Sequence, residues 1–264
     1  MLLLAEAQLF DLGHSLYMGI SVLASALILI LSYIFVKKQS HKEGLLKFWA
    51  IITVAIHYSI MWVQYLKNET VEVGGNLLFP LFACNACMWM LVAVAFIKNK
   101  DCLAFRLLAE FVFWGGIVCG IVGILLNDNY IGSAGLSSYA IFKGLLSHST
   151  MLIGAIYLLV GGFIKIRVFN VLSVAFGLSI FLLDGLIMNA IYSACGLGEA
   201  NSMYLQAPPF ENMPWLNTAF IGIVALAVCF TITAIYEQIA LPSNERWYTK
   251  IKLYIDSKKS VKEK

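Results

Sequence analysis

The chain has 264 residues and a net charge of +3. It is 61% hydrophobic and 12% charged, whereas a soluble globular domain carries roughly 25% charged residues. This composition excludes an ordinary soluble fold, and the small net charge gives no reason to expect a nucleic-acid partner. The apolar residues form long blocks, and about 20 apolar residues in a helix cross the ~30 Å hydrocarbon core of a bilayer. We therefore predict an all-α polytopic membrane protein, with residues 1–264 as a single integral membrane domain.

Seven apolar blocks are predicted to form membrane-spanning helices. In chain order they cover residues 14–36, 46–66, 77–97, 102–126, 139–163, 168–192 and 216–239. The segment before the first block has no basic residue and the block itself is long, so we do not interpret it as a cleaved signal peptide. A basic tail over residues 240–264 follows the last span.

The Lys and Arg residues indicate how this bundle of seven transmembrane helices is oriented. All 18 of them except Lys67 and Lys143 lie in or beside the segments that follow the first, third, fifth and seventh spans. These four segments lie on the same side of the membrane. Loops rich in Lys and Arg stay in the cytoplasm. The distribution predicts an outer N-terminus, a cytoplasmic C-terminus and tail, and we expect a multi-pass protein of the plasma membrane.

Ionisable residues inside spans are costly and usually face a partner or a cavity. His57 lies in the second span, Glu110 in the fourth and Asp184 in the sixth. His57 is expected to form a hydrogen bond between helices. Glu110 and Asp184 are expected to pair with a neighbouring cation or with backbone groups. Their sequence positions leave a functional role open for all three.

The third span carries Cys84, Asn85 and Cys87 near its outer end. At 1.5 Å per residue, Cys84 lies about 10 Å below that end, and His148 of the fifth span lies about 13 Å below its own outer end. A histidine at this depth can activate a thiol as a nucleophile, and an amide such as Asn85 or Asn189 can bind a developing oxyanion. Simple packing of the small thiols is the alternative interpretation.

Three other kinds of site fit the sequence less well. A redox pair of Cys84 and Cys87 would need a second pair in an outer loop, where only Cys195 lies. A metal site on Cys84, Cys87 and His148 would lack the second clustered pair of a strong zinc motif, so we predict no metal and no cofactor. The last span contains no lysine, which excludes a retinal-binding photoreceptor.

Several short motifs occur in a fixed order along residues 45–240. The third span opens with "PLFAC" and the fourth contains "FVFWGG". His148 lies in the outer half of the fifth span, Asn189 near the end of the sixth, and "NSMYLQAPP" in the last outer loop. In this order and spacing the chain resembles the YwaF-like family of bacterial integral membrane proteins, whose eukaryotic relatives are Cys/His acyltransferases acting on lysophospholipids.

The resemblance implies a role for each matching residue. Cys84 would accept the acyl group as a thioester, and His148 would act as the base. The polar residues that would shape the substrate site are Asn189, Asn201 and Tyr204. Our leading hypothesis is an acyltransferase that uses membrane lipids, with Asn85 also at the substrate. The alternatives are a non-enzymatic protein that binds or transports a lipid or small molecule through an outward-facing cavity, and a membrane thiol oxidoreductase.

Overall fold

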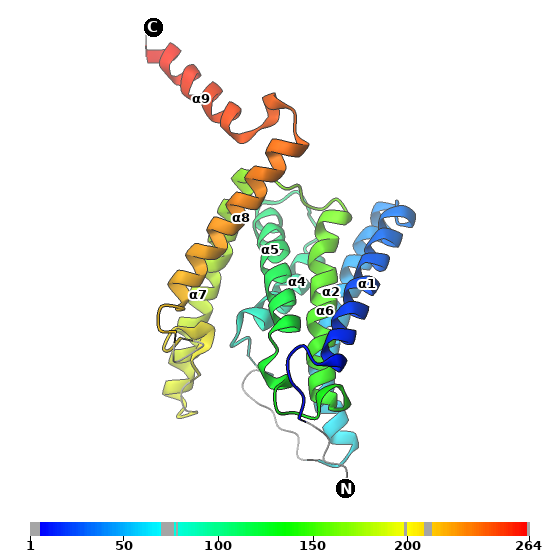
Figure 1. The fold of residues 1–264 in the computed structure, drawn as a ribbon. Helices are drawn as coiled ribbons and strands as arrows, with labels where there is room; N and C mark the ends of the chain where they lie inside the picture. Colours follow the sequence, from blue (N-terminus) through cyan, green and yellow to red (C-terminus); the bar gives the residue numbers. More distant parts are fainter. Residues whose placement is uncertain (1–5, 70–76, 78, 198–199, 209–212, 263–264) are drawn as a thin grey trace.

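The computed structural model describes residues 6–69, 77, 79–197, 200–208 and 213–262 (Figure 1). These residues form α-helices joined by loops and short 3₁₀ turns, and none of them lies in a strand. The helices are α1 (Leu12–Phe35), α2 (Gln39–Leu66), α4 (Ala83–Phe96), α5 (Leu103–Leu125), α6 (Tyr139–Val160), α7 (Val171–Ala194), α8 (Thr218–Ala240) and α9 (Trp247–Lys262). The prediction of an all-α fold is confirmed.

Six of the described helices are long and apolar enough to cross a membrane: α1, α2, α5, α6, α7 and α8. The third predicted span is different, because α4 has only 14 residues and reaches about 21 Å at 1.5 Å per residue. Phe79–Phe82 run into α4 without helical structure. Pro80 accounts for this late start, since proline lacks an N–H group and disfavours a helical residue before it.

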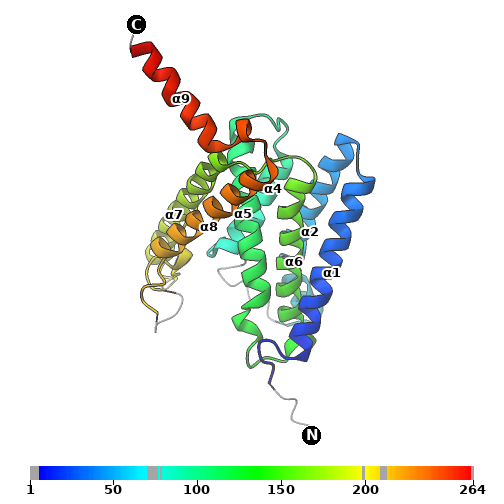
Figure 2. The same cartoon turned by 45° about the horizontal axis from the view of Figure 1, so that its top comes forward.

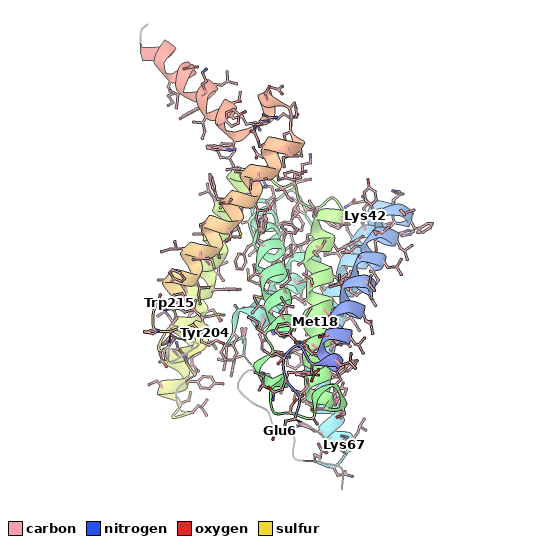
Figure 3. All side chains as sticks on the ribbon, in the orientation of Figure 1. Glu6, Met18, Lys42, Lys67, Tyr204 and Trp215 are labelled. Carbon is pink, nitrogen blue, oxygen red and sulfur yellow. The ribbon has the colours of Figure 1, made fainter. Side chains whose placement is uncertain are left out.

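The two ends of the helix bundle differ in charge. Figure 1 shows the N-terminus at one end and the C-terminus at the other, and Figure 3 places Lys42 near the C-terminal end, with Glu6 and Lys67 opposite. We call the end that holds the loops after α1, α4, α6 and α8 the basic end. We call the opposite end the N-terminal end. The alternation of loops between two ends agrees with the predicted order of spans.

The centre of the bundle is built by α5 and α6, which are the most deeply buried spans. Gly116 and Gly120 of α5 allow this close contact, because a Cβ atom there would lie 2.7 Å from Ala155 Cβ and 2.8 Å from Leu152 Cβ, respectively. Gly116 and Gly120 thus mediate close packing of α5 against α6. Helices α2 and α4 pack on the same centre, α1 lies at one flank, and α7 and α8 lie side by side at the other (Figure 2).

Buried carboxylates fasten the basic end. Glu110 of α5 accepts a hydrogen bond of 2.5 Å from Asn170 Nδ2. Glu237 of α8 accepts one bond of 2.7 Å from the Val168 N–H and another of 2.8 Å from the Trp247 N–H. Both glutamates thus stabilise the fold. They hold the connection between α6 and α7, and Glu237 also fixes the start of α9.

Candidate functional site

The N-terminus of α4 is held in place by the loop between α7 and α8. The carbonyl of Leu81 accepts hydrogen bonds from Ser202 Oγ and from the Met203 N–H, both 2.9 Å long. Asn189 of α7 in turn holds Ser202: its Oδ1 accepts from the Ser202 N–H at 2.7 Å, and its Nδ2 donates to the Ser202 carbonyl at 3.4 Å. Asn189 therefore positions the segment that leads into Cys84.

Asn201 and Tyr204 shape the same loop. Asn201 has a left-handed backbone with φ of 42°, and its Oδ1 accepts hydrogen bonds from the N–H groups of Gln206 (3.1 Å) and Ala207 (3.0 Å). The ring of Tyr204 lies 5.4 Å from that of Phe82, two residues before Cys84. Figure 3 labels Tyr204 and Trp215 on the flank formed by α7 and α8.

Cys84 belongs to a short hydrogen-bonded chain. Its thiol donates to Asn85 Oδ1 at 3.2 Å, and Asn85 Nδ2 lies 3.5 Å from Nε2 of His57 on α2. An amide nitrogen can only donate, so His57 Nε2 is the acceptor and the proton of the neutral ring is on Nδ1. The structure thus adds His57 to the site. Its depth could have revealed it, since it lies about nine residues, or ~13 Å, from the end of α2.

Cys84 lies at the N-terminal end of its helix. It is the second residue of α4, and Phe82 gives no side-chain cap. The first N–H groups of a helix have no carbonyl partner within it, and they favour negative charge on a thiolate or on a bound oxyanion. The N–H groups of Asn85 and Ala86 donate to the Phe82 carbonyl at 3.0 and 3.1 Å, so the N–H of Cys84 itself is the donor available at this end of the helix. The side chain is half-buried.

His148 lies on the neighbouring side of α5. Its Nδ1 donates to the Gly144 carbonyl at 2.8 Å, which leaves Nε2 of the neutral ring as the atom that can take a proton. The ring occupies the place where a Cβ on Gly123 would be. One turn away on α5 lies Cys119, which interacts electrostatically with Cys84. No hydrogen bond joins Cys84 to His148 within the described ranges, so their pairing stays a prediction.

Cys87 has a different environment from Cys84. It is fully buried, and its Sγ lies 3.0 Å from the position of a Cβ on Gly115. All six cysteines are free thiols. The part of the chain that the structure describes contains no group of three or more His, Cys, Asp or Glu side chains arranged to hold a metal ion.

Asp184 of α7 is half-buried. Its Oδ2 atom has no hydrogen-bond partner among the residues that the structure describes. The expected pairing of this carboxylate with a cation or a backbone group is therefore not seen for Oδ2.

A hollow of about 430 Å³ lies at the N-terminal end, between the start of α1 and the connection from α5 to α6. Asp11 lines it and caps α1 by accepting hydrogen bonds from the His14 N–H (2.7 Å) and from the Tyr130 hydroxyl (3.1 Å). The bond from the His14 N–H is the main reason why the pKa of Asp11 is lowered. Cys84, His148 and Asn189 do not line this hollow.

The fold and these contacts define a multi-pass helical membrane protein in which a cysteine at a helix N-terminus lies among polar side chains of neighbouring helices. A family model described as the TMEM164 family matches residues 9–236, which include α1 to α7 and most of α8. The chain therefore belongs to the TMEM164 family, and this description takes the place of the YwaF-like name expected from the motifs. No curated protein and no solved structure matches the chain.

Proposed function

We propose that this protein is an acyltransferase of the plasma membrane that moves a fatty acyl group between phospholipid and lysophospholipid. The observation that carries the proposal is the position of Cys84 in the first turn of α4, with its thiol oriented by Asn85. The proposal includes one membrane domain of seven spans over residues 1–264, with α4 as the third, an outer N-terminus and a cytoplasmic tail.

In the first half-reaction the Cys84 sulfur attacks the ester carbonyl carbon of the donor phospholipid. His148 Nε2 takes the thiol proton, and the N–H of Cys84 at the start of α4 stabilises the oxyanion. The carbon–oxygen ester bond then breaks, His148 returns the proton to the departing oxygen, and lysophospholipid leaves. The acyl group remains as a thioester on Cys84.

In the second half-reaction the hydroxyl of an acceptor lysophospholipid gives its proton to His148 Nε2 and attacks the thioester carbonyl. The carbon–sulfur bond breaks and the thiolate of Cys84 recovers the proton from His148. Asn85 and His57 position the thiol throughout, while Asn189, Asn201 and Tyr204 hold the loop above the entry to α4.

The location of the site supports a lipid substrate. His148 lies about 13 Å from the start of α6 at 1.5 Å per residue, and Cys84 follows the non-helical residues 79–82 at the start of α4. Ester bonds of phospholipids lie near the boundary between the headgroups and the hydrocarbon core. A half-buried thiol at this depth therefore meets an ester bond of a lipid that enters from the side of the bundle.

The test is acyl transfer by purified protein in proteoliposomes that contain phospholipid with a radiolabelled acyl chain and unlabelled lysophospholipid. Wild type and the matched control Cys87→Ala are expected to produce labelled phospholipid from the acceptor. Cys84→Ala should abolish the transfer, and His148→Gln should reduce it about 10²–10⁴-fold, the usual contribution of a general base. Undiminished transfer by Cys84→Ala would overturn the proposal.

A second candidate is a protein that binds or transports a lipid without reacting with it. The observation that favours it is the lack of a hydrogen bond between Cys84 and His148 among the described residues. It predicts that Cys84→Ala leaves lipid binding unchanged and that no acyl transfer occurs. A thiol oxidoreductase is less well supported, because Cys87 is fully buried beside Cys119 and Gly115.

A further inference from the structure

Lys143 is a half-buried cation beside the candidate site. It is the fifth residue of α6, and its Nζ atom donates a hydrogen bond of 3.1 Å to the carbonyl of His57. His57 is the residue whose ring contacts Asn85 next to Cys84. The ammonium group is therefore fixed on the same turn of α2 that contacts Asn85.

The charge of Lys143 has no carboxylate partner in the described part of the chain. The two ion pairs found there are Lys67 with Glu69 and Arg167 with Glu245. Lys67, the other cation predicted at the N-terminal end, is thus paired and exposed, whereas Lys143 is neither. A cation that is partly removed from water is unfavourable unless an anion or a set of acceptors compensates it. One carbonyl oxygen occupies only one of the three N–H donors of an ammonium group.

The distance between Lys143 and His148 suits one kind of anion. The two residues interact electrostatically, and five residues of α6 separate them by about 7.5 Å along the helix axis. In a glycerophospholipid, two glycerol carbons separate the phosphate oxygen from the oxygen of the nearer ester bond. A lipid with its phosphate at Lys143 therefore has its ester carbonyl one to two helical turns deeper, at the level of His148 and Cys84.

We infer that Lys143 binds the phosphate of the lipid substrate, so that the site selects phosphorylated glycerolipids over neutral glycerides. The inference rests on the proposed function for its location, since it assigns a headgroup contact to the same site. Lys143 lies nearer the N-terminal end than His148, and the long side chain of a lysine reaches toward the headgroup layer. The headgroup phosphate accepts the hydrogen bonds that the ammonium group does not donate to the His57 carbonyl.

The experiment measures how lipids protect Cys84 from a thiol-alkylating reagent in detergent-solubilised protein, with mass spectrometry of the Cys84 peptide. The probes are lysophosphatidylcholine, a monoacylglycerol with the same acyl chain, and glycerol 3-phosphate. Wild type should be half-protected at about a tenfold lower concentration of lysophosphatidylcholine than of monoacylglycerol, a difference that corresponds to about 1.4 kcal/mol. Glycerol 3-phosphate alone should give no protection.

Three variants decide the role of Lys143. Lys143→Gln, which can still donate to the His57 carbonyl, should lose the preference for the phosphorylated lipid, and Lys143→Arg should keep it. Lys67→Gln is the matched control and should behave as wild type. Equal protection by both lipids in wild type, a preference retained by Lys143→Gln, or protection by glycerol 3-phosphate alone would each overturn the inference.

This measurement does not depend on acyl transfer. If Cys84 forms no thioester but Lys143→Gln loses the preference, the proposed reaction fails and the phosphate contact stands. If acyl transfer occurs but the preference is absent, the reaction stands and the phosphate contact fails. Should Lys143→Gln not fold, loss of the preference in Lys143→Ala with an unchanged unfolding temperature supports the inference, and its retention there overturns it.

Discussion

Substitution of Gly123 by alanine is predicted to inactivate the protein with little loss of stability. The imidazole ring of His148 fills the space beside Gly123, and a Cβ there would overlap it. Overpacking of a helix contact costs about 1–3 kcal/mol, and the higher helix propensity of alanine returns about 1 kcal/mol. The net loss of stability is thus at most about 2 kcal/mol, and the ring must turn away from its present position.

The loss of activity should be large, because displacement of a general base lowers the reaction rate about 10²–10⁴-fold. The assay is acyl transfer in proteoliposomes, with thermal unfolding measured in detergent on the same preparation. Gly116→Ala is the matched control, since its Cβ would meet Ala155 Cβ at 2.7 Å in the same helix contact and has no atom of His148 among its nearest neighbours. Gly19→Ala has no heavy atom within 4 Å of the new Cβ and should change neither property.

Two results would refute this reasoning. One is wild-type transfer by Gly123→Ala, because His148 would then be dispensable in its present position. The other is an equal loss of activity in Gly116→Ala, because the loss would then follow from packing of α5 against α6 and not from the imidazole ring.

Three further predictions concern contacts outside the reacting groups. Glu237→Ala removes two charge-assisted hydrogen bonds from Val168 and Trp247 and should lower the free energy of unfolding by about 3 kcal/mol, whereas an unchanged unfolding temperature would show that this carboxylate is not a cap. Asn201→Ala should loosen the loop before α8, seen as faster proteolysis, while Asn201→Gly, which tolerates the positive φ, should resist better; equal rates would contradict this. Because the pKa of Asp11 is lowered in the folded protein, its stabilisation is complete above about pH 4 and is lost as the pH falls through the lowered value. Amide exchange at the start of α1 should accelerate there, and Asp11→Asn should remove this pH dependence; an identical pH profile in the variant would count against the cap.

Much of the fold is predictable from the sequence because the bilayer imposes one length scale. Apolar blocks of about 20 residues locate α1, α2, α5, α6, α7 and α8 to within a few residues, except that α2 begins at Gln39, before its apolar block. Helix α4 begins at Ala83, six residues after the predicted start of the third span at residue 77. Hydropathy does not register that Pro80 interrupts the helix, or that the Leu81 carbonyl is used by Ser202 and Met203.

The candidate site was predictable only in part, because depth in the membrane does not fix which helix faces which. Counting residues placed Cys84 and His148 at similar depths. It could not show that the imidazole ring of His148 packs on Gly123, or that Asn85 connects the thiol to His57. Those contacts depend on the rotation of α4, α5 and α6 about their axes, and α4 has no strong apolar face that would set its rotation.

The most direct test of the acyl-enzyme proposed on Cys84 is the mass of the Cys84 peptide during turnover. The protein is incubated with phospholipid that carries an isotopically labelled acyl chain, quenched in acid and digested. The account predicts one labelled acyl group on Cys84 that neutral hydroxylamine releases, with Cys87 unmodified. Acyl transfer that proceeds with Cys84 unmodified, or at an unchanged rate in Cys84→Ala, would contradict it.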